Sequence, residues 1–371
     1  MKNLLQGTLL ISLLVLASCK KDEPVQGDNL GTSDLPEFYL GSEHNDPLVK
    51  VELGVLDGIF QPQDLDFKPD LNELWVMNKG TNGSDFVIIQ NPGANSQTII
   101  KRKDSHSGHF VVNGTALAFS NINTFATSPE IKNTVQDTNS LFMGPALWSG
   151  DLNIFANIHQ SNWDPSRPLG SHLDMLHQSP YAMGIAHDND NIFWVLDGYN
   201  GNLCLYDFAA DHGPGAEFHA DGNVYRYRDV PFSRVRDIPS HIIKDKKSKK
   251  LYMCDTKNGK VLELDMSTSE RKERLTPTNE GLNSYYAYEG TTITTFADQL
   301  VRPCGIDIND NRLFVTDYFT GNIHVYDLDT KEELAVLETG EDGITGIKVS
   351  KSNRIWFVNY KTNKLYQVIP Q

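Results

Sequence analysis

Histidine is concentrated in one part of the chain. Six of the eleven histidines lie between residues 172 and 241, in the segments GSHLDMLHQSPYAMGIAHD, DHGPGAEFHADGN and PSHII. Asp174, Asp211 and Asp221 lie among them. Imidazole and carboxylate groups are the ligands that zinc and similar divalent ions take in proteins. The pattern predicts a site for a divalent metal such as zinc or calcium, with these candidate ligands: His172, His177, His187, His212, His219 and His241.

The spacing of these residues leaves a second interpretation open. His172 and His177 are five residues apart, and the chain contains no His-Glu-x-x-His motif. None of the spacings is that of an established ligand motif. The histidines can therefore also be ordinary loop and strand residues that hydrogen-bond to backbone. The Gly-x-Ser-x-Gly elbow of serine hydrolases does not occur either.

Aromatic residues near the same loops suggest a different kind of site. Trp148, Trp163 and Tyr181 lie in or beside long connecting segments. Aromatic rings in such loops can stack on sugar rings or hold peptide side chains, which makes these three residues candidates for ligand binding. Packing of the loops onto the fold is an equally good explanation of the same rings.

These loops must be held by regular elements, and one element recurs along the chain. Residues 314–328 read FVTDYFTGNIHVYDL, which is an apolar strand, a Gly-containing turn and a second apolar strand. Similar hairpins occupy residues 194–208, 252–266 and 356–369. This pattern is typical of β-hairpins. One polar residue follows the first strand in every copy and is expected to cap the turn: Asp197, Asp255, Asp317 and Asn359.

A short strand precedes each hairpin, and aligning these strands gives a repeat with six members. The aligned column is Asp64, Thr115, Gly184, His241, Gly305 and Gly346. Repeats of this length with three or four strands each predict an all-β fold, a six-bladed β-propeller. Seven blades remain an alternative, because the second repeat is poorly patterned. In this arrangement Asp64 joins the candidate metal ligands, because it heads an inner strand and is expected near His241 at the axial channel.

Each blade also needs an outer strand. The segments that we expect in this position are residues 97–103, 223–229, 270–276 and 333–339. The last repeat has no fourth strand before the chain ends, whereas residues 48–56 form a spare strand before the first repeat. Pairing of these two ends would close the ring and remove an open sheet edge.

The repeats resemble NHL repeats, in which Pro-x-Gly-Ile-Ala-x-Asp precedes a Gly/Asn hairpin. RPCGIDINDNRLFVTDYFTGNIHVYDL shows this best. The resemblance implies a six-bladed propeller and little about activity. Peptide-amidating lyases are similar propellers whose zinc histidines follow the strand-opening prolines. The corresponding residues here are Gln63, Ser240 and Cys304, so that activity is not implied.

The first residues resemble a bacterial lipoprotein signal. Lys2 precedes a long uncharged apolar run that ends in Leu16-Ala17-Ser18-Cys19, as a signal peptide with a lipobox does. The resemblance implies that Cys19 is lipidated, and an ordinary secretory peptide or membrane anchor is the alternative. The following Lys-Asp-Glu resembles an export tag for the cell surface. We therefore expect a signal peptide over residues 1–18, a lipidated Cys19 with a flexible tether over 19–47, and the propeller over 48–371.

The composition of the chain limits the kinds of molecule that it is expected to bind. The formal net charge is −15, from 48 acidic and 33 basic residues, which argues against nucleic acid as a partner. Cys204, Cys254 and Cys304 lie in apolar strand contexts and are expected to be buried free thiols. The expected protein is an outer-membrane lipoprotein of a Gram-negative bacterium, facing the periplasm or the outside.

Two functions from different classes follow. The first is a ligand-binding or scaffold module that uses face loops in residues 129–180 and 209–222 to bind an unknown extracellular or periplasmic ligand. The second is a metal-dependent lyase or hydrolase with a His-rich site over the axial channel. Long loops on a rigid scaffold commonly carry function, which is why both hypotheses depend on the same two segments.

Overall fold

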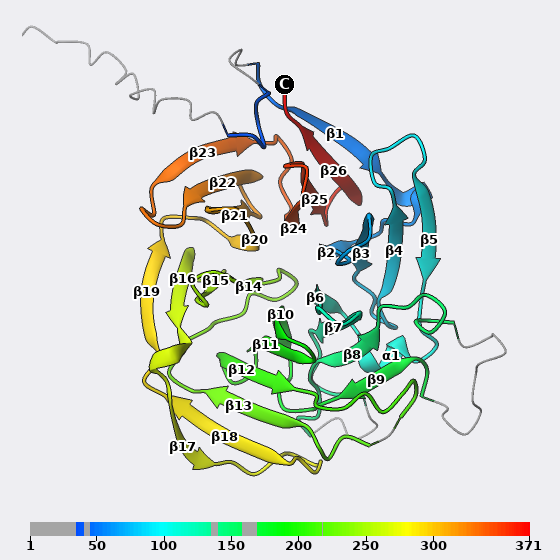
Figure 1. Ribbon diagram of the computed structural model, residues 1–371, viewed down its shortest axis with the longest axis vertical. Coiled ribbons are helices and arrows are strands. Elements are labelled where there is room, and N and C mark those ends of the chain that lie inside the picture. Colours follow the sequence, from blue (N-terminus) through cyan, green and yellow to red (C-terminus); the bar gives the residue numbers. More distant parts are fainter. Residues whose placement is uncertain (1–34, 41–44, 135–139, 158–168, 217) are drawn as a thin grey trace, which may run out of the picture. The chain divides into compact units, whose positions relative to one another are not determined.

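A computed structural model describes residues 35–40, 45–134, 140–157, 169–216 and 218–371. Six β-sheets surround a common centre (Figure 1). The innermost strand is the first along the chain in five of them, whereas in the sixth β24 is innermost and β1 is outermost. This is a six-bladed β-propeller, as the repeats predict. The helical elements of the described residues are the short helix α1 (Ser107–Phe110) and two 3-10 turns, η1 (Val55–Asp57) and η2 (Met266–Thr268).

The first three blades follow one another along the chain, and the first four strands of each are antiparallel to their neighbours. Blade 1 consists of β2 (Pro62–Phe67), β3 (Glu73–Asn78), β4 (Asp85–Gln90) and β5 (Thr98–Arg102). Blade 2 consists of β6 (Gly114–Phe119), β7 (Thr124–Pro129), β8 (Ala146–Ser149) and β9 (His172–Met175). Blade 3 begins with β10 (Ala182–Asn189), β11 (Ile192–Asp197), β12 (Asn202–Asp207) and β13 (Asn223–Tyr227).

The remaining blades complete the ring. Blade 4 consists of β14 (Ile242–Lys244), β15 (Leu251–Asp255), β16 (Lys260–Asp265) and β19 (Thr292–Ala297). Blade 5 consists of β20 (Pro303–Asn309), β21 (Arg312–Asp317), β22 (Asn322–Asp327) and β23 (Glu333–Glu338). Blade 6 consists of β24 (Ile344–Val349), β25 (Ile355–Asn359), β26 (Lys364–Ile369) and β1 (Leu48–Leu53). The ring is therefore closed as predicted, by antiparallel pairing of β1 with β26 that places Leu48 opposite Ile369.

The hydrophobic core lies between the blades. Side chains alternate between the two faces of a strand, so neighbouring residues pack into different interfaces. Trp75 of β3 packs with blade 2, whereas Val76 packs with blade 6. Cys204, Cys254 and Cys304 are buried free thiols, as expected. Burial raises the pKa of the Cys204 thiol to about 11, which leaves it protonated and unreactive.

The polar residue at the end of the second strand caps its hairpin, as predicted, in blades 3, 5 and 6, whereas Asp255 of blade 4 accepts instead from the Asn258 side chain. Asp317 Oδ1 accepts hydrogen bonds from the backbone N–H groups of Phe319 and Thr320, at 3.0 and 3.3 Å. Asn359 makes the same bonds in blade 6, and Asp197 makes them in blade 3. The recurrence of these residues is therefore structural.

One predicted outer strand belongs to a different blade. Residues 270–276 were expected to complete blade 4, but β19 takes that place. Instead, β17 (Glu270–Arg274) pairs with β18 (Ser284–Glu289), and β18 pairs in parallel with β13 of blade 3. Every residue of β17 is exposed, whereas Phe296 of β19 packs into the interface with blade 5. The apolar content of β19 explains why it is the strand that covers blade 4.

The folded unit begins earlier than residue 48. Leu35 and Phe38 are buried in the interface of blades 5 and 6, and Glu37 is fully buried with its carboxylate 2.8 Å from the Arg312 guanidinium. Residues 35–40 therefore pack against the propeller, where a flexible tether was expected. Cys19 and the rest of the expected signal and tether lie outside the described residues.

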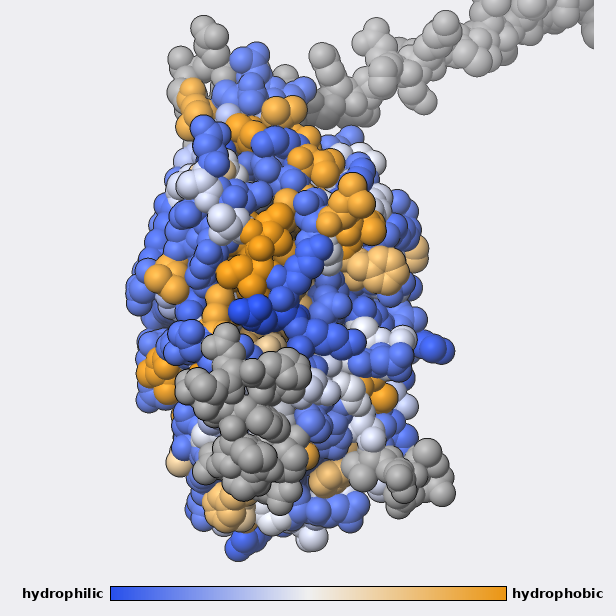
Figure 2. Space-filling model, turned by 90° about the vertical axis from the view of Figure 1, so that its right-hand side faces the viewer, coloured by the Kyte–Doolittle hydropathy of each residue, from blue (hydrophilic) through white to orange (hydrophobic). Residues whose placement is uncertain are grey.

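The rim on the side of β1 and β5 faces the viewer in Figure 2 and is mainly hydrophilic, with separate groups of apolar side chains. The exposed large apolar side chains of β1 and η1 are Leu48, Val51, Val55 and Leu56. None of the helices in the described segments has the length and apolar composition that crossing a bilayer requires.

Candidate metal centre

The candidate metal centre lies at the outer edge of blade 2. The outermost strand of that blade, β9, carries His172 and Asp174, and all four of its residues are buried. An outermost strand would normally be exposed, but the loop between β12 and β13 covers this one. The Gly215 N–H donates to the His172 carbonyl at 2.8 Å. The long insert of residues 208–222 thus buries the polar side chains of β9.

Asp174 is a fully buried carboxylate in this centre. Its side chain is 0% exposed, and Oδ1 accepts from His219 Nδ1 at 2.5 Å. Its other oxygen, Oδ2, is buried and has no hydrogen-bond partner within the described part of the chain. Burial raises the pKa of Asp174, and the hydrogen bond from His219 opposes that rise. A buried carboxylate oxygen without a partner costs free energy unless a cation or donor reaches it.

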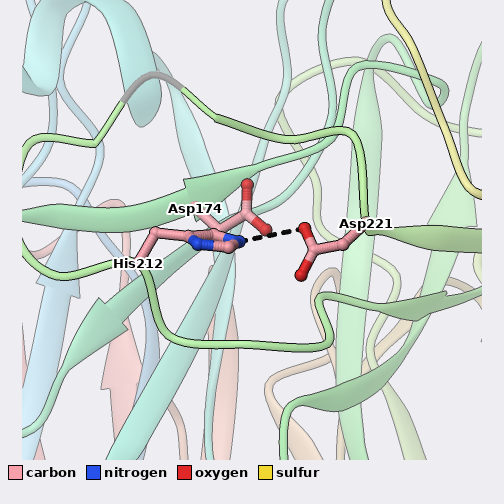
Figure 3. Close-up of side chains that lie close together, drawn as sticks. All are labelled: Asp174, His212 and Asp221. Atoms are coloured by element: carbon pink, nitrogen blue, oxygen red, sulfur yellow. Dashed lines mark hydrogen bonds and ion pairs between the residues drawn. The ribbon is translucent and has the colours of Figure 1, made fainter.

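Two residues of the covering loop approach the same carboxylate. His212 Nε2 lies 2.9 Å from Asp221 Oδ1. Asp174, His212 and Asp221 each offer one ligand atom, and these three atoms all lie within 4.8 Å of one another (Figure 3). Zinc bonds of 2.0–2.1 Å with tetrahedral angles place ligand atoms about 3.3 Å apart. Small side-chain movements would therefore bring these three groups onto one ion.

Two further histidines present bare ring nitrogens beside this group. His172 Nδ1 donates to the Leu169 carbonyl at 2.9 Å, and His177 Nδ1 lies 2.8 Å from Glu280 Oε2. A neutral ring that donates from Nδ1 has its lone pair at Nε2. The Nε2 atoms of His172 and His177 are both buried and, among the described residues, have no hydrogen-bond partner. Metal-binding histidines show this pattern, with the distal nitrogen tied to a carboxylate or carbonyl.

His109 of α1 completes the cluster. The ring centroids of His109 and His177 are 6.4 Å apart, those of His177 and His219 are 6.0 Å apart, and those of His172 and His219 are 6.3 Å apart. Burial, and then the neighbouring histidines, lower the pKa of His172 to about 3 and that of His109 to about 4. Both rings are therefore neutral at pH 7, which is the form that binds metal.

Aromatic packing holds the rings in place. The His172 ring stacks on Phe110 with a centroid distance of 3.7 Å, and the His177 ring stacks on Phe142 at 3.8 Å. Fixed rings with bare nitrogens, next to a buried carboxylate, suit zinc or another divalent transition metal. Calcium takes oxygen ligands, so the imidazole-rich composition disfavours the calcium alternative.

The sequence-based candidates divide into one group of four histidines and three residues that lie elsewhere. His172, His177, His212 and His219 come together at the edge of blade 2, whereas the site was expected over the axial channel. His187 lies on β10 and its Nε2 is 3.1 Å from the Asp190 carbonyl. His241 and Asp64 lie together near the axis, with 3.6 Å between Nδ1 and Oδ1. The expected axial position was therefore wrong for the four grouped histidines, because the loop between β12 and β13 crosses β9 at the outer edge of blade 2.

Two members of the cluster were missed from the sequence. His109 lies in the connection between blades 1 and 2, outside the region of high histidine density, although His106 three residues earlier offered a weak signal. Glu280, the partner of His177, lies in the β17–β18 hairpin. Its approach to blade 2 depends on the docking of that hairpin on blade 3.

The aromatic candidates have other roles. Trp148 is fully buried in the interface of blades 1 and 2, so its ring cannot stack on an external ligand. Tyr181 is half-buried, and the Arg234 guanidinium lies over its ring at 4.2 Å from the centroid. Trp163 lies outside the described residues.

Comparisons with known proteins identify the fold. No protein-family model matches the chain, and no curated protein matches it by sequence. An auxiliary nutrient binding protein from Bacteroides ovatus is similar in structure, with a TM-score of 0.56 and 11% identity over 88% of this chain and 78% of that one. Virginiamycin B lyase from Staphylococcus aureus gives 0.50 and 12%, over 88% of this chain and 100% of that one. At these identities the likeness shows the fold alone.

Proposed function

We propose that this protein is a ligand-binding propeller of the bacterial cell envelope that binds a divalent transition metal ion at the outer edge of blade 2. One observation carries the proposal. Three ligand atoms, from Asp174, His212 and Asp221, lie within 4.8 Å of one another. The rings of His172 and His177, whose Nε2 atoms have no partner among the described residues, lie about 6 Å from the ring of His219, which is hydrogen-bonded to Asp174. Leaving Asp174 Oδ2 and the two histidine nitrogens buried without a partner destabilises a fold, and a bound ion removes that cost.

The envelope location rests on different support. The apolar run that ends in Leu16-Ala17-Ser18-Cys19 resembles a lipoprotein signal, and Cys19 would carry the lipid that anchors the protein to the outer membrane. The auxiliary nutrient binding protein of Bacteroides ovatus is consistent with a propeller that binds a ligand. The export-tag resemblance of residues 20–23 favours the outer cell surface.

A second function is a metal-dependent lyase or hydrolase at the same centre. The observation that favours it is a cavity of about 290 Å³ that His177 lines together with Arg226 and Arg228. A substrate in this cavity would lie next to a metal ligand. The cavity is at the lower end of the size range of small-molecule sites. The structural likeness to virginiamycin B lyase shows only that this fold can carry an enzyme.

Metal titration of the full-length protein tests the proposal. The protein is stripped with a chelator and titrated with Zn²⁺, Mn²⁺ and Ca²⁺ by calorimetry. We expect about one Zn²⁺ per chain, weaker Ca²⁺ binding, and a thermal stabilisation by Zn²⁺ that the chelator reverses. Asp174→Asn and the double variant His172→Gln/His177→Gln should each weaken Zn²⁺ binding by about 100-fold or more.

His187→Gln is the matched control. His187 lies outside the cluster, so this substitution should leave the affinity for Zn²⁺ unchanged. Failure of the wild-type protein to bind any transition metal would overturn the proposal. Equal affinity of wild type and the Asp174→Asn variant would place the ion elsewhere on the chain. Turnover of a substrate that is lost with the metal would favour the enzyme.

A further inference from the structure

A cavity separate from the metal centre opens where the inner strands end. It has a volume of about 350 Å³ and is lined by residues of all six inner strands and of the loops that follow them. We call it the axial funnel. A wider cavity of about 790 Å³ adjoins it and shares Phe67, Pro69, Phe119, His187 and Lys246 with it. Volumes of this size suit small-molecule ligands.

Charged side chains line one side of the axial funnel. They come from three successive blades, with Asp307 on β20, Lys348 on β24 and Asp66 on β2. Each carboxylate accepts a backbone hydrogen bond from the next blade. Val349 N–H donates to Asp307 at 2.7 Å, and Phe119 N–H donates to Asp66 at 2.9 Å. These bonds fix the two carboxylates in position, and each oxygen retains capacity for another donor.

The Lys348 ammonium lies between these carboxylates and makes only long contacts with them. Its Nζ is 3.5 Å from Asp307 and 3.6 Å from Asp66. No shorter polar contact to this nitrogen occurs within the described segments, and normal N–H···O hydrogen bonds are 2.7–3.2 Å long. The side chain is 20% exposed. Burial alone would lower the pKa of Lys348, but Asp66, Asp307 and Asp64 together raise it, so the ammonium keeps its donors.

The other side of the axial funnel offers apolar surface beside the charged residues Lys244, Asp245 and Lys246. Ala118, Ala186 and Ile243 come from blades 2, 3 and 4, and Phe67 stands beside Asp66. A ligand in the axial funnel would therefore meet fixed acceptors and an ammonium donor along one edge and hydrocarbon along the other. The lining carries three carboxylates, including Asp245, and three lysines, including Lys244 and Lys246, so a net charge of either sign on a ligand would meet like charges.

We propose that the axial funnel binds a neutral polyhydroxylated molecule of monosaccharide size. Neighbouring hydroxyl groups both donate and accept, so they can donate to Asp66 and Asp307 while they accept from Lys348. The C–H face of such a ring would pack against Phe67 and the apolar side. This site is independent of the metal centre, which lies on the outer edge of blade 2.

Calorimetric titration of the full-length, chelator-treated protein with glucose, galactose, mannose and myo-inositol tests the proposal. We expect at least one of them to bind. If a hexose binds, the affinities of its uronic acid and of its 2-amino sugar should both be lower by about tenfold or more. Lys348→Met should weaken binding of the same ligand by about tenfold or more, and Lys348→Gln by less. Lys50→Met, a lysine on β1 outside the axial funnel, should leave it unchanged.

Each contrary result overturns the proposal in a different way. No binding of any neutral ligand at millimolar concentration rules out the ligand class. Stronger binding of a zwitterion such as leucine than of any sugar would assign the charged side to an amino acid instead. Unchanged affinity of the folded Lys348→Gln and Lys348→Met variants would place the ligand elsewhere. Asp174→Asn should bind the sugar normally, which separates this test from that of the metal centre.

Discussion

His241 of blade 4 reaches across the axis to Asp64 of blade 1. Its Nδ1 lies 3.6 Å from Asp64 Oδ1, and its Nε2 donates to the Thr115 carbonyl of blade 2 at 3.0 Å. Asp64 in turn accepts from the Leu117 N–H at 2.9 Å. One imidazole thus joins three blades, and Asp64, Thr115 and His241 are all nearly completely buried. Where Asp64, Thr115 and His241 meet, the centre of the propeller is therefore filled by packed polar side chains.

Removal of this imidazole should destabilise the whole ring. His241→Ala leaves a small cavity and leaves Asp64 without its neighbouring imidazole, and the Thr115 carbonyl loses its donor. Together these losses should lower the free energy of unfolding by about 2–4 kcal/mol. Chemical denaturation measures the change. The control His187→Ala should cost less than about 1 kcal/mol, and an equal loss for both variants would contradict the role assigned to His241.

Asp64 should make stability depend on pH. Burial raises its pKa above the usual value of 3.8, and His241 and Lys348 oppose that rise without cancelling it. A carboxyl group with a raised folded pKa binds its proton more tightly in the folded state. Its stabilising contribution is complete below the unfolded pKa and is lost as pH rises through the folded pKa.

Asp64→Asn removes this titration, so the stability of wild type relative to the variant should fall as pH rises from 4 to 7. Urea denaturation of both proteins across that range measures the trend. Other raised carboxyl groups, such as Asp307, titrate in both proteins and cancel in the difference. A difference that stays constant or grows with pH would show that the pKa of Asp64 is not raised.

The blades could be predicted because their signals are local. Alternation of apolar residues and Gly/Asn turns defines each hairpin within about 15 residues, and closure by residues 48–53 follows from counting strands. The docking of β18 on blade 3 could not be predicted in this way. It depends on parallel pairing of Asn223 with Ser284 and of Tyr227 with Tyr288, far apart in sequence.

Most residues of the candidate metal centre could be predicted from the sequence, but the position of the centre on the propeller could not. His172, His177 and His219 lie on two inserts of neighbouring blades, so their proximity was a reasonable expectation. Their position at the rim depends on how the loop crosses β9, through contacts such as that between Gly215 and His172. No local pattern encodes that path. The same reason explains why His109, which enters from the preceding blade connection, was missed.

Glu37 should contribute strongly to stability, although it precedes the first blade. Its carboxylate is fully buried against Arg312, which is 16% exposed. Glu37→Gln leaves that guanidinium partly buried without its main counter-charge, and the free energy of unfolding should fall by about 2–4 kcal/mol. Glu270→Gln is the control, because Glu270 is exposed and its one ion pair within the described residues is with the exposed Lys272. Exposed pairs of this kind contribute at most about 1 kcal/mol.

Cys19 should determine whether the protein is found in the membrane fraction. Cys19→Ser removes the thiol that the lipobox resemblance predicts to be lipidated, and the variant should be released as soluble protein. Cell fractionation in high salt, with metabolic labelling by a fatty acid, measures both effects. Cys204→Ser serves as the control, because that thiol is buried and should leave fractionation unchanged. A Cys19→Ser variant that stays with the membranes would refute the lipoprotein assignment.

The strongest test of the architecture is removal of the closing strand. Deletion of residues 48–56 removes β1, so the backbone groups of β26 that face β1 lose their partners along the whole strand. It also exposes the apolar side chains that β1 and η1 help to cover. Leu53 of β1 is only 5% exposed and packs in the interface of blades 6 and 1. An unpaired edge also promotes association between chains. We expect this deletion to lower the melting temperature by about 10 °C or more and to promote aggregation.

Deletion of residues 20–33, which precede the packed segment, is the matched control and should leave the melting temperature unchanged. Deletion of residues 20–40 should fall between the two, because it also removes Leu35, Glu37 and Phe38 from the interface of blades 5 and 6. Equal melting temperatures for the 48–56 and 20–33 deletions would mean that the pairing of β1 with β26 does not hold the ring closed.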